Sequence, residues 1–113
     1  MITYWHNPRC SKSRAGLALL QEKGVEVETR LYLKDAPSLE EIKQVQAALG
    51  VDPIDMMRYK DALFKELGLS EESSEKELLA AMAENPALIE RPIAILADKA
   101  VIGRPTDALE ALI

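Results

Sequence analysis

The chain contains a single cysteine, Cys10, and the residues around it favour a reactive thiol. Cys10 follows a short apolar segment and precedes a helix-forming one, with Arg9, Lys12 and Arg14 close by in the sequence. Positive charge and the unpaired N–H groups of a helix N-terminus both stabilise a thiolate, so we expect a pKa below the value of about 8.5 for a free cysteine. The alternative is an inert buried cysteine, which is common among free cysteines. A loop rich in arginine, lysine, serine and asparagine is a poor apolar core, and this composition favours the reactive thiol.

Three polar side chains near Cys10 could assist such a thiol. Ser11 and Ser13 could cap the helix, or their hydroxyls could contact a bound oxyanion, because both roles use the free N–H groups of the first turn. His6 precedes Cys10 across an Asn-Pro turn signal and could hold or polarise the thiol. The loop backbone could equally satisfy the histidine ring. Both alternatives stay open for each residue at this point.

The cysteine and its spacing also exclude several chemistries. A phosphatase loop needs a longer spacing between cysteine and arginine than the three residues that separate Cys10 from Arg14. Ser13 occupies the position of the second cysteine of a dithiol motif, so a redox cycle must use a thiol from another molecule. One cysteine and one histidine cannot supply the three or four ligands of a zinc site.

Arginines elsewhere in the chain are candidates for binding an oxyanion. A lone arginine on a helical surface is usually solvated or weakly paired, and this is the simpler interpretation for Arg58. Arg91 and Arg104 differ, because each directly precedes a proline in a segment that is otherwise apolar. An arginine in such a place is unusual for a core and typical of the edge of a site.

The segments that must position these residues alternate between strand and helix. Residues 2–5 predict a short buried strand, and the segment from Ser11 to a Gly24 cap predicts a helix of about four turns. Residues 25–33 alternate apolar and polar side chains, with Leu31 and Leu33 among the apolar ones, which predicts an edge strand with one exposed face. A strand, a helix and a strand in this order predict a right-handed unit with parallel strands.

The middle of the chain, residues 38–89, is predicted to be helical. Its helix-start signals are two capping boxes and one Asp-Pro pair: Ser38 with Glu41, Ser74 with Glu77, and Asp52-Pro53. The short helix that begins at the Asp-Pro pair is expected to carry Arg58. No linker or repeat divides the chain, so we expect one domain, residues 1–113, with residues 38–89 as a helical insertion.

The last segment, residues 91–113, predicts two short strands around a turn and then a helix that begins near Pro105. The whole order predicts a thioredoxin-like α/β fold with a four-stranded mixed sheet and a helical insertion, although the order alone leaves other folds open. Such folds place a cis-proline before the third strand, facing the cysteine, and Pro92 is the candidate for it.

The charge and hydropathy of the chain limit its partners and its location. The formal net charge is −5, from 19 acidic and 14 basic side chains, which disfavours a nucleic-acid or anionic-membrane surface. No apolar run approaches the ~18 residues of a membrane span, and the N-terminal residues do not form a signal or transit peptide. We therefore expect a cytoplasmic protein that binds neither nucleic acid nor membrane.

Four motifs occur in order along the chain: His6-Asn7-Pro8-Arg9-Cys10 with Ser13-Arg14; Arg58 ahead of Glu66-Leu67-Gly68-Leu69; Asn85-Pro86 before Arg91-Pro92-Ile93; and Gly103-Arg104-Pro105. Through these motifs the chain resembles the glutaredoxin-linked arsenate reductases from end to end. The resemblance implies a thioredoxin-like fold, Cys10 as the nucleophile on arsenate or a similar oxyanion, and a role for His6 in setting the thiol pKa. It also implies that three arginines bind the oxyanion: Arg58, Arg91 and Arg104. We expect Ser11 and Arg14, next to the cysteine, to contact the oxyanion as well.

The partners that the resemblance implies are glutathione as co-substrate and glutaredoxin as protein partner, with no tightly bound cofactor or metal. We expect a monomer. One alternative is a redox-responsive regulator that binds a protein such as RNA polymerase, although relatives of that kind commonly carry a second cysteine where this chain has Ser13. The other is a glutathione-dependent thiol transferase, which has no evident need for three arginines around its thiol.

Overall fold

The computed structural model describes the whole chain, residues 1–113, and divides it into two compact units. The first unit combines Met1–Asp35 with Arg91–Ile113, and the second is the segment Ala36–Glu90. The second unit nearly coincides with the helical insertion expected at about residues 38–89. The organisation of the chain as one domain stays a prediction.

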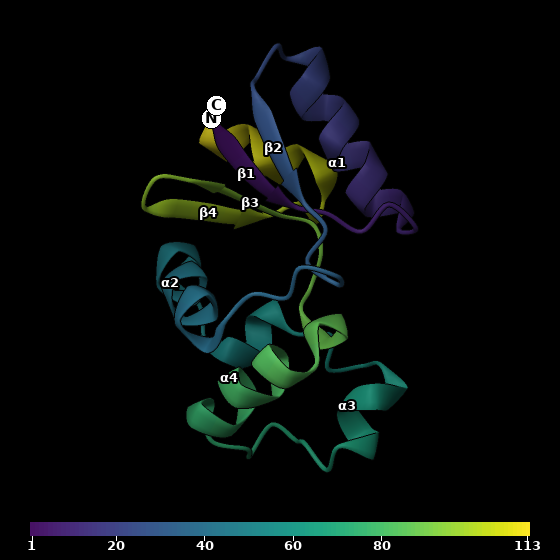
Figure 1. Cartoon of the computed structure of the whole chain (residues 1–113), viewed down its shortest axis with the longest axis vertical. Helices are drawn as coiled ribbons and strands as arrows, with labels where there is room; N and C mark the ends of the chain where they lie inside the picture. Colours follow the sequence, from purple (N-terminus) through teal and green to yellow (C-terminus); the bar gives the residue numbers. More distant parts are fainter. The chain divides into compact units, whose positions relative to one another are not determined.

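A four-stranded mixed sheet organises the first unit (Figure 1). Its strands are β1 (Ile2–Trp5), β2 (Val27–Arg30), β3 (Ile93–Leu96) and β4 (Lys99–Ile102). They lie in the order β2-β1-β3-β4, with β2 parallel to β1, β3 antiparallel to β1, and β4 antiparallel to β3. The predicted parallel strand–helix–strand unit, the edge position of its second strand and the C-terminal hairpin are therefore confirmed.

Two helices of the first unit pack against each other and join the sheet in one core. They are α1 (Ser11–Glu22) and the 3-10 helix η3 (Thr106–Leu112), and η3 also contacts β3 and β4. The last segment is thus helical, but it is wound as a 3-10 helix, and α1 has 12 residues, or about three turns. The buried side chains that form the centre of this core are Ile2, Tyr4, Leu20, Ala94, Leu109 and Leu112.

Gly16 allows α1 to approach the sheet closely. The hydroxyl of the fully buried Tyr4 donates a hydrogen bond of 2.7 Å to the backbone carbonyl of Ser13. A Cβ atom added at Gly16 would collide with that hydroxyl and would lie 2.9 Å from Cδ1 of Leu109, which is also fully buried. A side chain at this position must therefore displace packed core atoms.

We expect Gly16→Ala to lower the free energy of unfolding by about 1–3 kcal/mol, the usual cost of adding an atom to a packed core. Alanine favours a helix over glycine by ~1 kcal/mol, so a measured loss would show that the collision outweighs helix propensity. The measurement is urea unfolding, repeated in a Tyr4→Phe background, where the alanine should cost less because the colliding hydroxyl is absent. A Gly16→Ala protein as stable as the parent would contradict this account of the contact.

β2 is shorter than the strand predicted over residues 25–33, and its early end exposes two leucines. The strand ends at Arg30, where the backbone N–H of Tyr32 donates to the Arg30 carbonyl and turns the chain away from the sheet. The turn reverses the alternation, so that Tyr32 is fully buried while Leu31 and Leu33 are 39% and 45% exposed. The predicted extent of this strand, and with it the burial of its apolar side chains at Leu31 and Leu33, is therefore wrong.

The second unit contains helical elements and one isolated β-bridge. The helices are α2 (Leu39–Leu49), η1 (Pro53–Met56), α3 (Ala62–Glu66), α4 (Glu75–Glu84) and η2 (Pro86–Leu88). Both predicted capping boxes form, at Ser38 before α2 and at Ser74 before α4. α4 packs against α2, η1 and η2, which makes it the central helix of this unit. None of the helices in the chain is long and apolar enough to cross a membrane.

Arg58 does not lie on a helix, which corrects the expectation from the sequence. The short helix η1 begins at Pro53 as predicted but ends at Met56. The next residue, Met57, has extended backbone and pairs with Ile89 in the antiparallel bridge of this unit. The backbone N–H of Arg58 then donates to the Leu88 carbonyl at 2.7 Å, so pairing with a distant segment replaces the next helical turn.

Candidate active site

Cys10 occupies the N-cap position of α1. Its backbone is extended, with φ −93° and ψ 123°, and its N–H donates to the Asn7 carbonyl at 2.9 Å. Its own carbonyl accepts the N–H of Arg14 at 3.0 Å and begins the helix. No side chain caps α1, so capping, one of the two alternatives for Ser11 and Ser13, does not occur. The cysteine itself stands where the helix presents its unpaired N–H groups.

The surroundings of Cys10 lower the pKa of its thiol below the ordinary value. Partial burial raises this pKa, but hydrogen bonds from the Ser13 backbone N–H, the Arg91 side chain and the Lys12 backbone N–H outweigh burial, with the charge of Arg91 in addition. All of these groups are donors or positive charges that favour the thiolate. The anionic sulfur expected from the sequence therefore has identified partners.

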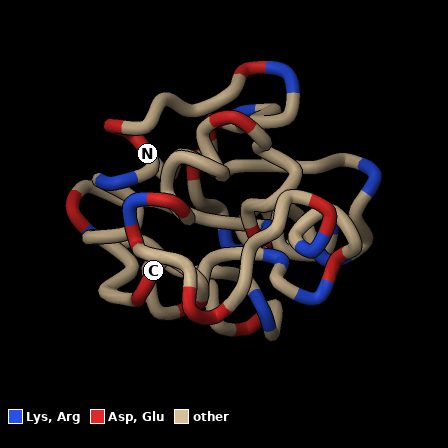
Figure 2. Tube along the Cα trace, turned by 90° about the horizontal axis from the view of Figure 1, so that it is seen from below, with Lys and Arg blue, Asp and Glu red and all other residues tan.

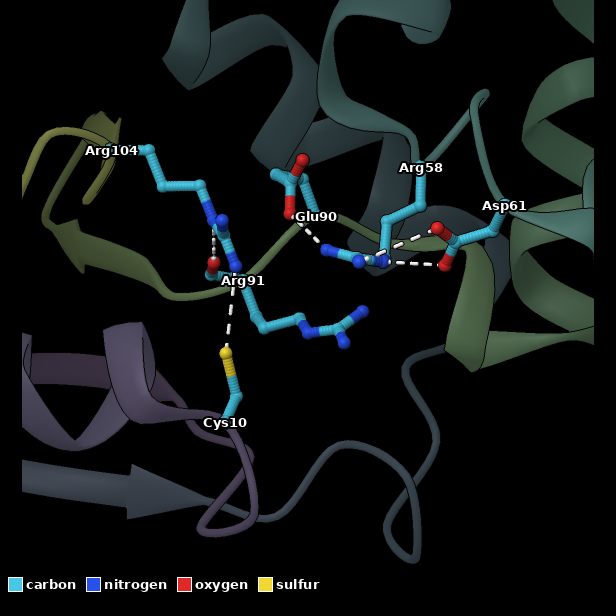
Figure 3. Close-up of polar contacts among 6 residues, drawn as sticks. All are labelled: Cys10, Arg58, Asp61, Glu90, Arg91 and Arg104. Atoms are coloured by element: carbon cyan, nitrogen blue, oxygen red, sulfur yellow. Dashed lines mark hydrogen bonds and ion pairs between the residues drawn. The ribbon is translucent and has the colours of Figure 1, made fainter.

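Two arginines of the first unit lie beside the sulfur (Figure 3). Nη2 of Arg104 is 3.5 Å from Sγ of Cys10, and Nε of Arg104 donates to the Arg91 carbonyl at 2.7 Å. The peptide bonds Arg91–Pro92 and Arg104–Pro105 are both cis, and Pro92 is the position where the sequence placed a cis-proline. Two guanidinium groups next to a nucleophilic sulfur can hold a tetrahedral oxyanion by paired hydrogen bonds.

His6 contacts Ser13 rather than the sulfur. Its Nδ1 is 2.7 Å from Oγ of Ser13, and the backbone N–H of Asn7 donates to the same Oγ at 2.9 Å. Because Oγ already accepts a hydrogen bond from Asn7, the hydroxyl can donate to Nδ1 of a neutral His6. Burial and then the charge of Arg14 lower the pKa of His6 and favour that neutral form. The pair joins the loop before Cys10 to helix α1.

We expect Ser13→Ala to lower the free energy of unfolding by about 1–3 kcal/mol, since it leaves the Asn7 N–H and His6 Nδ1 without their partner. Ser13 is fully buried, so water cannot readily replace the hydroxyl. Urea unfolding measures the change, with Ser11→Ala as the matched control. Ser11 is exposed on the same turn, and its substitution should change stability by no more than about 0.5 kcal/mol. Equal effects of the two substitutions would show that the buried pair contributes nothing.

Arg14 and Ser11, the other residues expected near an oxyanion, differ in their surroundings. Nη1 of Arg14 donates to the Pro8 carbonyl at 2.8 Å and so fixes the loop before Cys10. Ser11 is exposed in the first turn of α1. Contact of either side chain with an oxyanion stays a prediction.

Arg58 belongs to the second unit, where two carboxylates engage it (Figure 3). Its Nε and Nη2 donate to the Asp61 carboxylate at 2.6 and 3.4 Å, and its Nη1 donates to Glu90 at 2.8 Å. Burial lowers the pKa of Arg58, but hydrogen bonding to Asp61 and the charge of Glu90 raise it overall. The role of Arg58 as an oxyanion ligand stays a prediction. Sequence analysis missed both carboxylates, although the spacing of three residues from Arg58 to Asp61 is a local signal for an ion pair.

No group of three or more histidine, cysteine, aspartate and glutamate side chains is arranged to hold a metal ion. Acidic and basic positions are interspersed along the trace (Figure 2). The site with the clearest chemistry is therefore the thiol with its two arginines.

Comparison with known proteins identifies a family and individual proteins with similar sequences. Residues 5–112 match the model of the ArsC family. A protein of Neisseria meningitidis named arsenate reductase is 47% identical over 114 residues, with 99% of this chain and 97% of that protein covered. Another of that name, from Haemophilus influenzae, is 46% identical over 110 residues, with coverage of 96% and 95%.

A solved structure agrees with the fold of the chain. The arsenate reductase from Vibrio cholerae superposes with a TM-score of 0.94 at 43% identity, covering 99% of this chain and 97% of that one. The predicted fold class, a thioredoxin-like α/β fold with a four-stranded mixed sheet, is confirmed.

Proposed function

The chain belongs to the ArsC family, and from this premise we propose that it reduces arsenate to arsenite with Cys10 as the nucleophile. The observation that supports the proposal best is the thiol itself. Its pKa is lowered, and a guanidinium nitrogen of Arg104 lies 3.5 Å from its sulfur. An anionic nucleophile beside fixed positive charge suits an attack on an oxyanion, because the arginines offset the repulsion between the two anions.

In the first step the Cys10 thiolate attacks arsenic(V). A sulfur–arsenic bond forms, and one oxygen of arsenate leaves as water after protonation. Arg91 and Arg104 hold the remaining oxygens, because the planar guanidinium matches two oxygens of a tetrahedral oxyanion and keeps its charge at any working pH. The backbone N–H groups of Ser13 and Lys12 stabilise the sulfur until the bond forms.

The second half of the cycle uses two thiols from outside the chain, since Cys10 is its only cysteine. Glutathione displaces another oxygen as water and binds arsenic through its sulfur. A glutaredoxin thiolate then attacks the glutathione sulfur, and the electron pair of that arsenic–sulfur bond stays on arsenic, which becomes arsenic(III). Water cleaves the Cys10–arsenic bond and releases arsenite. In sum, arsenate and two thiols give arsenite, one disulfide and one water.

The remaining parts of the proposal follow from this cycle. Glutathione is a co-substrate, and no tightly bound cofactor takes part in any step. The need for reduced glutathione and glutaredoxin fits a cytoplasmic protein. Each step uses one chain, which fits a monomer.

The test is NADPH oxidation by the purified protein with glutathione, glutaredoxin and glutathione reductase, with and without arsenate. We expect oxidation that requires both arsenate and Cys10. Absence of an arsenate-dependent signal from folded protein with a reduced thiol would contradict the proposal. Arsenate-independent turnover of a glutathionylated protein would instead identify a thiol transferase.

A further inference from the structure

A cavity of about 340 Å³ lies next to the loop that leads to Cys10. This volume is in the range of about 300–1,000 Å³ that is typical of sites for small molecules. All of its lining residues belong to the first unit: His6, Asn7, Pro8, Arg9, Leu31, Leu33 and Lys34. The first four of these directly precede Cys10, so a molecule in the cavity lies against the segment that carries the nucleophile.

Two positive charges line this cavity without an acidic partner in the chain. Arg9 and Lys34 are both exposed, and neither takes part in a salt bridge. Asp35 directly follows Lys34 in the sequence, but its carboxylate pairs with Arg30 at 3.3 Å. In a chain with a net charge of −5, two unneutralised cations in one cavity favour an anionic ligand.

The cavity also has apolar walls that the fold leaves open. Leu31 and Leu33 are 39% and 45% exposed, because the chain turns after β2. Pro8, in the loop that leads to Cys10, is exposed as well. A cavity that is lined both by exposed apolar side chains and by two cations is suited to a small ligand that has an aliphatic part and anionic groups.

We propose that this cavity binds the thiol co-substrate, a small peptide thiol with two free carboxylates, which is glutathione in the proposed function on which this inference rests. One carboxylate pairs with the guanidinium of Arg9 and the other with the ammonium of Lys34. The aliphatic part of the peptide lies on Leu31 and Leu33. A protein partner would need about 800 Å² on each side of an interface, so the size of the cavity favours a peptide over a protein as its occupant.

Binding can be tested without any redox step by using S-methylglutathione, in which the thiol is blocked. We expect its addition to shift the backbone amide NMR signals of residues 6–9 and 31–34. Lys34→Glu and Arg9→Glu should each raise the Kd about tenfold or more, because each loses a charge-assisted hydrogen bond and gains repulsion. Lys99→Glu is the matched control, since Lys99 is exposed on β4 outside the cavity and undergoes the same charge change.

The ligand can be varied in the same way as the protein. The diethyl ester of S-methylglutathione lacks both negative charges, so it should bind the parent protein at least about tenfold more weakly. The ester keeps the ammonium group of the peptide and is a cation, so it should bind Lys34→Glu no more weakly than it binds the parent protein. Equal binding of the acid and the ester would overturn the assignment of the carboxylates.

Kinetics separate this inference from the proposed function. In the coupled assay Lys34→Glu should raise KM for glutathione about tenfold and leave KM for arsenate within about twofold. Arsenate turnover with an unchanged KM for glutathione and unchanged S-methylglutathione binding would overturn the glutathione site while the reductase stands. Binding that depends on Lys34, in a protein without arsenate turnover, would support the site and contradict the reductase.

Discussion

Cys10→Ser is expected to lower arsenate-dependent NADPH oxidation by about a thousandfold or more, to the level of the assay without protein. The hydroxyl of serine is not ionised at neutral pH, so the substitution removes the anionic nucleophile. An oxygen bridge to arsenic also offers no sulfur that external thiols can regenerate by exchange. The backbone donors at Ser13 and Lys12 and the charge of Arg91 would then face a neutral group.

The control for this prediction is stability, because serine differs from cysteine by one atom. Cys10 is partly exposed, and its backbone hydrogen bonds to Asn7 and Arg14 do not involve the side chain. Urea unfolding should therefore show a change of no more than about 1 kcal/mol. A folded Cys10→Ser protein that retained a tenth of the parent turnover would rule out Cys10 as the nucleophile.

Arg91→Lys is expected to lower kcat/KM for arsenate by about ten- to a hundredfold, although the positive charge is kept. A lysine ammonium cannot hold two oxygens of the oxyanion in the plane of one group. The same substitution should raise the pKa of the Cys10 thiol, since the Arg91 side chain donates to the sulfur and lowers that pKa. The thiolate is present above its pKa, so the rise of reactivity with pH should move to higher pH.

The pH profile of Cys10 alkylation by iodoacetamide measures this shift directly, without arsenate. Arg30→Lys is a suitable control, because the Arg30 guanidinium pairs with Asp35 and lies 5.8 Å from the centre of the Trp5 ring. Its profile should coincide with that of the parent protein. If the Arg91→Lys profile also coincided with it and kcat/KM stayed within about twofold, Arg91 would have no part in activating the thiol.

Local signals explain which parts of the fold could be predicted from the sequence. The capping boxes at Ser38 and Ser74 depend on residues three positions apart, and both form. The end of β2 depends on a turn after Arg30 that the regular alternation of apolar residues does not reveal. The sequence therefore predicted the helix starts that carry a capping box better than the bounds of β2, which begins at Val27 and ends at Arg30.

In the site, too, the features with a local sequence signal could be predicted, and those that depend on distant contacts could not. The polar loop and the Arg-Pro pairs identified Cys10, Arg91 and Arg104 as candidates, but only the sheet brings them together. In the antiparallel pairing of β1 with β3, Trp5 lies opposite Ile93, so the loop after β1 meets the residues just before β3. The contact of His6 with Ser13 depends on the shape of a turn, and that of Arg58 with Glu90 on segments 32 residues apart. Neither can be read from spacing.

The anchoring of Ser13 has a consequence for the speed of the chemistry. Tyr4 holds its carbonyl, while His6 and Asn7 hold its hydroxyl, and burial raises the pKa of Tyr4 so that its hydroxyl stays protonated as a donor. The N–H of Ser13 faces the sulfur, and its position is thus fixed because Ser13 is hydrogen-bonded to three other residues. Water around a free thiolate must reorient whenever charge moves from sulfur to the oxyanion, whereas this dipole is preorganised before substrate arrives. The free-energy cost of orienting this dipole is part of folding, so the reaction itself does not include it in each turnover.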